Sequence, residues 1–324
     1  MSHQEGNRIM QEENRIMPWL RLLRLPNLFT APGDSLAGYF LASAFIGNKT
    51  VSLWTIVLLA VTSVFTYAFG VVMNDVMDYQ EDCRNRPERP LPSGKISRDR
   101  ATIFCAQLWG LSVVLLVICT KLKCLFFYDV LFVLLGLWLT IVLYNFWLKR
   151  YRLVGSIAMG LCRGLNFLLG VTATGCGVSF AKVWPVFVPF AAITAYIAAV
   201  TWLADKENEE QNVGFVVQIP AIATAMAWFG TVLPLPEKTV ALAIPAVVLV
   251  QTVFLLEQTA SKLYHNTVEP NDMQRAIGAL LRPLVFWQVT WILFSTTTAA
   301  FVVSAFLFAG WFCAKALSKA IAQS

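Results

Sequence analysis

Residues 51–73 read VSLWTIVLLAVTSVFTYAFGVVM, and residues 74–94, which follow directly, read NDVMDYQEDCRNRPERPLPSG. The first stretch is mostly apolar and carries no charge, and its length matches the roughly 20 residues that a helix needs to cross a membrane. The second stretch begins with carboxylates and continues into a segment rich in Arg and Pro. This junction predicts a spanning helix that ends in a dense set of charges at the membrane surface.

The pattern of long apolar runs recurs along the whole chain. Of the 324 residues, 57% are hydrophobic and 14% are charged, whereas soluble domains carry about a quarter charged residues. The composition therefore excludes an ordinary soluble protein and predicts an all-α polytopic membrane protein, a single domain with nine transmembrane helices. The nine runs are 28–47, 51–73, 102–120, 124–147, 154–175, 182–204, 214–233, 238–258 and 283–313; the seventh is interrupted by Pro220.

Charge distribution predicts the orientation. With the amino terminus in the cytoplasm, the cytoplasmic segments hold 17 Lys and Arg residues and the opposite face holds 7, among them Lys315. This asymmetry follows the positive-inside rule. It accounts for the net charge of +6 without nucleic-acid binding. The predicted organisation is a cytoplasmic segment over 1–27 without a cleaved signal peptide, a membrane domain over 28–318 and a tail over 319–324. Two long cytoplasmic loops, 74–101 and 259–282, are expected to fold over a cavity.

The carboxylates after the second run are spaced to share one side of a helix. Asn74, Asp78 and Asp82 are four residues apart, with Asp75 beside them, so their oxygens form one stripe. Such hard oxygen ligands suit Mg²⁺, which is commonly held by one or two carboxylates plus a substrate phosphate. The simpler interpretation is a solvated helix end whose acids mark the membrane boundary.

A basic loop follows the acidic stripe. Arg86 and Arg89 lie among Pro87, Pro90 and Pro92, and the planar fork of Arg matches phosphate oxygens. Taken singly, each Arg also fits the positive-inside rule. Beside the stripe, the loop indicates a site for a metal-bridged diphosphate.

The stripe and loop together resemble the first aspartate-rich motif of the UbiA superfamily of intramembrane prenyltransferases. The resemblance extends to residues 21–27, which include Asn27, and to residues 144–150, which are similar to the family's Tyr/Lys motif and contain Tyr144 and Lys149. It implies nine helices around a central cavity, Mg²⁺, and transfer of an isoprenyl group from a polyprenyl diphosphate. Lys149 would then contact the diphosphate.

The second aspartate motif of that family is altered in this chain. Thr201, Asp205 and Glu209 follow the sixth run at the same four-residue spacing, but Glu replaces Asp at 209 and Lys206 lies between. Asp205 and Glu209 are expected to supply carboxylates for a second Mg²⁺. A solvated loop is the alternative.

Two ionisable residues are expected at membrane depth. Arg163 and Asn166 share a side of the fifth run, where Gly160 and Gly164 permit close helix packing. A buried Arg should meet a cavity or a partner, so Arg163 is a candidate for binding diphosphate or an anionic group of the acceptor. Asp34 either serves the acceptor site or neutralises a nearby Arg. The run around Arg163 is also similar to the EboC-like subgroup of UbiA relatives.

The function implied by the resemblance is Mg²⁺-dependent transfer of an isoprenyl group to an aromatic or other hydrophobic acceptor delivered from the membrane lipid, in a bacterial inner membrane or a plastid membrane. The alternatives are a non-catalytic relative that binds or moves a lipid or secondary metabolite, and, ranked last, a proton-coupled transporter built on Asp34 and Arg163.

His3, His265 and the seven Cys residues lack the spacing of a triad, a zinc site or a disulfide framework. The predicted catalytic residues are Asp78, Asp82, Lys149 and Asp205; the substrate-binding residues are Asn27, Asp34, Arg86, Arg89, Tyr144, Lys149, Arg163 and Asn166; the metal ligands are Asn74, Asp75, Asp78, Asp82, Asp205 and Glu209.

Overall fold

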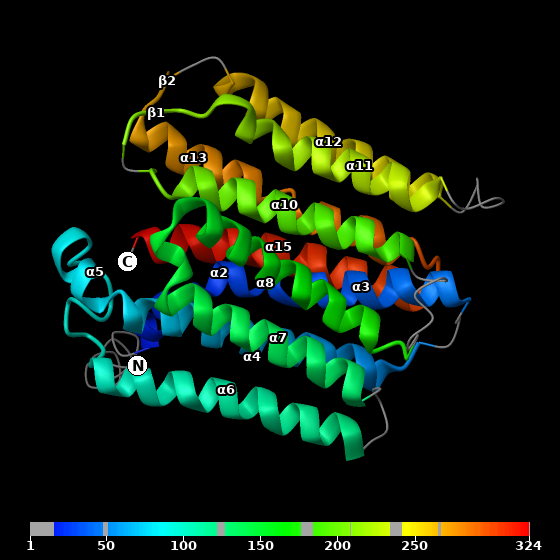
Figure 1. The fold of residues 1–324 in the computed structure, drawn as a ribbon, viewed down its shortest axis with the longest axis horizontal. Coiled ribbons are helices and arrows are strands. Elements are labelled where there is room, and N and C mark those ends of the chain that lie inside the picture. Colours follow the sequence, from blue (N-terminus) through cyan, green and yellow to red (C-terminus); the bar gives the residue numbers. More distant parts are fainter. Residues whose placement is uncertain are drawn as a thin grey trace, which may run out of the picture.

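The computed structural model describes residues 16–47, 51–121, 127–175, 184–207, 209–233, 242–264 and 267–323, and this part of the chain is a bundle of helices (Figure 1). The predicted all-α class is confirmed. Most of the predicted cytoplasmic segment (1–15), His3 and His265 lie outside the described residues. The helices are α2 (Leu25–Leu28), α3 (Ala31–Ile46), α4 (Leu53–Met77), α5 (Tyr79–Asn85), α6 (Arg98–Lys121), α7 (Phe127–Phe146), α8 (Arg152–Thr172), α10 (Phe187–Ala204), α11 (Ile219–Val232), α12 (Ala243–Leu263), α13 (Pro270–Leu281), α14 (Leu284–Leu293) and α15 (Thr298–Gln323), with the 3-10 turns η1 (Leu148–Arg150), η2 (Trp184–Val186) and η3 (Gly214–Gln218).

Within the described residues, nine helical segments are long and apolar enough to cross a membrane, which confirms the predicted number. The set differs from the prediction near each end of the chain. The first predicted run forms α3, which has only 16 residues. The predicted run 283–313 is divided between two spans, Pro270–Leu293 and Thr298–Ala316. Pro220 lies in the first turn of α11, next to the point where the seventh span changes from η3 to the α-helix, and its missing N–H is tolerated there.

The chain reverses between α14 and α15, so the prediction of one helix over 283–313 is wrong. Thr296 adopts a left-handed conformation with φ 53°, and α15 then runs back along the bundle (Figure 1). As a result, Lys315 lines the same cavity as Arg24. The prediction that Lys315 belongs to the opposite face is therefore also wrong.

The two predicted loops contain helices. α4 continues to Met77 and is followed by α5, while most of 259–282 is helical in α12 and α13. α13 buries Met273, Ala276 and Leu280, which recur every three to four residues and form its apolar face. α13 and α5 lie toward one end of the bundle, where β1 and β2 also gather (Figure 1).

α8 packs against three neighbours, α3, α7 and α10. Glycines make this close packing possible, as the spacing of Gly160 and Gly164 predicts. A Cβ atom on Gly160 would lie 2.1 Å from the backbone oxygen of Thr194 on α10, and one on Gly170 would lie 1.7 Å from the oxygen of Ser35 on α3. The backbone of α8 therefore touches α3 and α10 directly.

A short antiparallel pairing joins two loops at the α5 end of the bundle. β1 (Gln211–Asn212), after α10, pairs with β2 (Thr267–Val268), after α12. The side chain of Gln211 also donates to the backbone oxygens of Leu203 at 2.9 Å and Lys206 at 3.3 Å. The segment that carries Asp205 is thus held in place by Gln211.

Candidate active site

A cavity of about 590 Å³ opens among the helices of the described structure. Its wall includes predicted site residues from four helices, Asn27, Asn74, Tyr144, Arg163 and Asn166, and also Thr201, the first residue of the second stripe. The prediction missed several polar residues of the wall, namely Arg24, Thr30, Ser63, Tyr67, Arg282 and Lys315. The other predicted site residues lie outside this wall: Asp34, Asp75, Asp78, Asp82, Arg86, Arg89, Lys149, Asp205 and Glu209.

The wall has two polar regions, which we name by their residues. The mouth is the region of Arg24, Asn74 and Thr201, beside the two acidic segments, and the inner region is that of Arg163 and Asn166 on α8. Asn74 and Thr201 are far apart in the sequence, yet both line this one cavity. The two acidic segments therefore begin at a shared hollow, as the resemblance implies.

The first acidic stripe keeps helical spacing across the end of α4. The backbone N–H of Asp78 donates to Asn74 at 2.9 Å, and that of Asp82 donates to Asp78 at 2.8 Å. Asp78 separates α4 from α5 without changing this spacing. Asp75 and Asp82 are buried, with 6% and 4% of their surface exposed. Carboxylates that are buried to this degree require positive partners.

Arg89 supplies that partner for both buried carboxylates. Its Nη1 lies 2.7 Å from Oδ2 of Asp82 and 3.8 Å from Oδ1 of Asp75, which also accepts a bond from Nη2 of Arg24 at 3.0 Å. Burial disfavours the charge of Arg24, but the negative charges of Asp75 and Asp82 outweigh it and raise the pKa of Arg24 above its usual value. Arg24 therefore stays charged at the cavity wall.

Lys149 contacts the third carboxylate of the stripe. Its ammonium donates to Oδ1 of Asp78, and the two side chains are 22% and 21% exposed, so a ligand can reach both. Lys149 lies in η1, directly after α7, which carries Tyr144 into the cavity wall. The structure thus brings the predicted Tyr/Lys motif to the first acidic stripe.

The second acidic segment is held by Arg152. The guanidinium lies over the ring of Trp202 at 4.2 Å, donates to the backbone oxygen of that residue at 2.8 Å, and lies 3.4 Å from Oδ2 of Asp205. The side chain of Glu209 is 65% exposed and pairs with Lys206. Asp205 is therefore anchored to α8, whereas Glu209 pairs within its own segment.

Glu207, which the sequence analysis did not select, connects the two acidic segments. Its Oε1 accepts from Nη2 of Arg86 at 3.4 Å, across 121 positions of sequence. Glu207 lies outside the four-residue series of Thr201, Asp205 and Glu209, so the spacing gives no signal for it.

The residues of the first stripe fit Mg²⁺ when substrate oxygens complete the coordination. No group of three or more His, Cys, Asp or Glu side chains is placed to hold a metal ion within the described ranges. Mg²⁺ does not need such a group, because it retains waters and takes substrate phosphate as a ligand. Asp75 and Asp82 both contact the same nitrogen of Arg89. A Mg²⁺ ion in the position of that nitrogen would therefore lie near both carboxylates. Glu209 is turned toward Lys206 instead.

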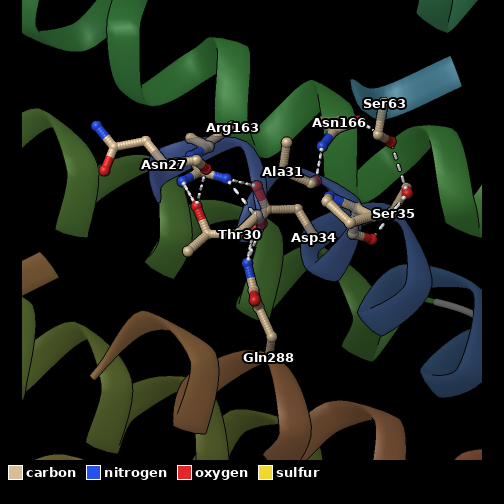
Figure 2. Close-up of polar contacts among 10 residues, drawn as sticks. Asn27, Thr30, Ala31, Asp34, Ser35, Ser63, Arg163, Asn166 and Gln288 are labelled. Atoms are coloured by element: carbon tan, nitrogen blue, oxygen red, sulfur yellow. Dashed lines mark hydrogen bonds and ion pairs between the residues drawn. The ribbon is translucent and has the colours of Figure 1, made fainter. Parts of the chain in front are cut away.

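The inner region of the cavity wall belongs to a polar cluster, which Figure 2 shows in close-up. Asp34 is completely buried and lies between two donors, Nη1 of Arg163 at 2.6 Å from Oδ2 and Nε2 of Gln288 at 2.7 Å from Oδ1. The backbone oxygen of Thr30 accepts from the same two side chains, at 3.2 and 2.8 Å. Asp34 thus neutralises Arg163, which is one of the two roles expected for it.

Asn166 fastens the other side of this cluster. Its Nδ2 donates to the oxygen of Ala31 at 2.8 Å, and its Oδ1 accepts from Ser63 at 2.8 Å. Ser63 shares a further bond of 2.7 Å with Ser35 (Figure 2). Helices α3, α4 and α8 are therefore joined by polar contacts between their buried faces.

Sequence comparison relates this architecture to known proteins. A model of the UbiA prenyltransferase family matches residues 35–264. The digeranylgeranylglyceryl phosphate synthase of Methanocaldococcus jannaschii is 32% identical over 177 residues, which are 54% of this chain and 56% of that protein. The corresponding protein of Methanothermobacter thermautotrophicus is 38% identical over 120 residues, 37% of this chain and 40% of its own length. The chain thus spans about half the length of the curated relatives it matches.

Solved structures share the fold. A UbiA homolog from Archaeoglobus fulgidus, solved with DMAPP and Mg²⁺, has a TM-score of 0.58 at 18% identity, covering 90% of this chain and 98% of that one. A structure described for digeranylgeranylglyceryl phosphate synthase has a TM-score of 0.60 at 22% identity, covering 87% and 98%. With its apolar helices, this is a multi-pass membrane protein. The match over 35–264 shows that the chain belongs to the UbiA prenyltransferase family.

Proposed function

We propose that the protein is a Mg²⁺-dependent intramembrane prenyltransferase, which moves an isoprenyl group from a polyprenyl diphosphate to an aromatic or other hydrophobic acceptor. The observation that carries this proposal is the shared cavity. Asn74 and Thr201, at the start of the two acidic segments, line the same hollow as Arg163 and Asn166. A charged mouth and an interior with apolar walls suit a substrate with a charged head and a hydrocarbon tail.

The diphosphate is assigned to the mouth of the cavity. Arg86, Arg89 and Lys149 are proposed to bind its oxygens, exchanging their carboxylate partners for phosphate. Bound there, Mg²⁺ would supply positive charge against the negative charge of the diphosphate leaving group. The proposed metal ligands are Asn74, Asp75, Asp78, Asp82, Asp205 and Glu209, with the first stripe as the principal site.

The chemistry divides between the mouth and the interior. When the allylic C–O bond breaks, its electron pair goes to the diphosphate, and cations already placed at the mouth stabilise that charge more strongly than they stabilise the bound substrate. The acceptor supplies the electron pair for the new bond and loses a proton, which the released diphosphate can take up. Apolar wall residues such as Leu137, Ile141 and Val200 keep water from the cationic carbon.

The names of the relatives from Methanocaldococcus jannaschii and Methanothermobacter thermautotrophicus support a prenyl donor, since both proteins are digeranylgeranylglyceryl phosphate synthases. Asn27 and Tyr144 are proposed to contact substrate, because both line the cavity. The EboC-like resemblance of residues 159–166 and a bacterial or plastid membrane stay predictions. A cytoplasmic position of the α5 end is supported by its Arg-rich loop and by the return of Lys315 to the cavity.

The test uses the full chain, purified and reconstituted in lipid nanodiscs. With Mg²⁺, labelled geranylgeranyl diphosphate and 2-naphthol as the acceptor, we expect diphosphate release that EDTA abolishes and that Asp78→Asn lowers about 100-fold, the scale of losing one preorganised charge contact. Asp99→Asn is the matched control, because Asp99 lies exposed in the first turn of α6. Release that ignores EDTA, or that is equal in the two variants, would contradict the proposal.

A lipid-binding or transport protein is the second candidate, and the second acidic segment favours it. The side chain of Asp205 is 42% exposed, and Glu209 pairs with Lys206. A carrier would bind geranylgeranyl diphosphate without releasing diphosphate. The same nanodisc experiment, with bound and released label measured separately, distinguishes the two functions.

A further inference from the structure

The positive charge of Arg163, in the inner region of the cavity, is already neutralised by Asp34. Asp34 has no exposed surface, and its two oxygens are occupied by Arg163 and Gln288. The carboxylate is therefore shielded from any ligand, whereas the guanidinium is not. A molecule that enters the cavity meets Arg163 as one half of a pair with no net charge.

Arg163 keeps donors for a ligand in spite of this pairing. Its side chain is 13% exposed and lines the cavity. Nη1 donates to Asp34 and to the oxygen of Thr30, and Nη2 donates to Oγ1 of Thr30 at 2.9 Å (Figure 2). Three of the five guanidinium N–H bonds are thus committed to residues in the described part of the chain, and a ligand can use the other two.

We propose that this inner region is the acceptor subsite, and that it selects an aromatic head group with an uncharged hydroxyl or carbonyl oxygen over one with a carboxylate or phosphate. The inference deepens the proposed function and rests on it. It assigns Arg163 as the donor to that oxygen and Asp34 as the residue that determines specificity.

The preference follows from the charges that the subsite would hold. An anion bound at Arg163 would bring a second negative charge to the pair, so the three groups together would carry a net charge of minus one at membrane depth. Uncompensated charge in such a place is expensive. A neutral oxygen accepts a charge-assisted hydrogen bond from Arg163 and adds no charge.

The wall near Arg163 fits an aromatic ring. The guanidinium carbon lies 5.7 Å from the ring centre of Tyr67, which also lines the cavity. Met159 and Cys162 line it as well, and both precede Arg163 within about one turn of α8. Aromatic and apolar surface beside a charged donor is an arrangement that orients a flat ring with one polar oxygen.

The experiment compares two probes that share one ring system, 2-naphthol and 2-naphthoate, at about pH 7 with the full chain in nanodiscs. Binding is measured by equilibrium dialysis against empty nanodiscs. For the unmodified protein we expect naphthol to bind at least about tenfold more tightly, which corresponds to about 1.4 kcal/mol. Asp34→Asn leaves Arg163 as a net positive charge, so it should tighten naphthoate binding at least about tenfold and change naphthol binding less than about threefold. Asp99→Asn should change neither.

The inference is overturned if the unmodified protein binds naphthoate as tightly as naphthol, if it binds neither probe, or if Asp34→Asn matches Asp99→Asn. Where Asp34→Asn does not fold, the double variant Asp34→Asn with Arg163→Gln replaces the ion pair by neutral amides. It removes the charged donor, so naphthol binding should weaken about tenfold, and unchanged binding would overturn the role of Arg163.

Diphosphate release is recorded on the same preparations, which separates the subsite from the activity. Release with no preference for naphthol refutes only the subsite. A preference for naphthol without release refutes the transferase, and with it the acceptor role, but leaves the binding preference of the inner region.

Discussion

The contact between α3 and α8 leads to a prediction about Gly170, whose replacement by Ala should destabilise the protein. The added Cβ would lie 1.7 Å from the backbone oxygen of Ser35, whereas an ordinary contact begins at 3.4 Å. The two backbones must therefore separate by about 1.7 Å, since neither is a flexible side chain. Gly38, on the opposite side of this contact, would meet the oxygen of Phe167 at 2.0 Å in the same way.

The cost of such overpacking is about 1–3 kcal/mol. For large domains, each kcal/mol shifts the melting temperature by about 2–4 °C, so Gly170→Ala should lower it by about 2–12 °C. The separation also pulls Asp34 on α3 from Arg163 on α8, whose charged groups now lie 2.6 Å apart. The preference for naphthol over naphthoate should therefore weaken in the same variant.

The assay is thermal unfolding followed by tryptophan fluorescence in nanodiscs. Gly110→Ala is the matched control, because Gly110 lies within α6 and a Cβ there meets nothing within 4 Å. Ala is the better helix former by about 1 kcal/mol, so this control should melt at the same or a higher temperature. Equal melting temperatures for Gly170→Ala and Gly110→Ala would refute the direct backbone contact.

Three further predictions concern the mouth of the cavity. Lys149→Met should weaken binding of a thio-analogue of geranylgeranyl diphosphate about 10- to 100-fold, because a charge-assisted contact is lost, while Arg150→Met, at its exposed neighbour, should not. Asp205→Asn should slow diphosphate release more than Glu209→Gln, because Glu209 is 65% exposed and turned toward Lys206. The reverse order would make Glu209 the more important of these two carboxylates. Removing Mg²⁺ with EDTA should weaken binding of the same analogue, measured by calorimetry, whereas unchanged binding would exclude a metal-bridged diphosphate.

The membrane helices could be predicted because apolar runs of spanning length are a local property of the sequence. The division of 283–313 could not be found by hydropathy, since Ser295, Thr296 and Thr297 are too few to interrupt an apolar run. The reversal depends on the left-handed conformation of Thr296, which the surrounding packing fixes. α13 left a signal that was missed, because its buried residues recur at helical spacing.

The candidate site was predictable where its residues follow one another along a helix. The backbone at Asn74, Asp78 and Asp82 keeps the helical spacing that their positions predict. Contacts across helices were not predictable in this way. Gln288 reaches Asp34 across 254 positions of sequence, and nothing in the local pattern around either residue indicates that pairing.

The pairing of β1 with β2 makes two distant segments respond together. Ile277, Gly278 and Leu281 of α13 form part of the cavity wall, and the chain that leads into α13 is paired with the strand that carries Gln211. Gln211 in turn bonds to the turn around Asp205. We therefore expect a hydrocarbon large enough to push α13 outward to displace that turn, and Asp205 with it.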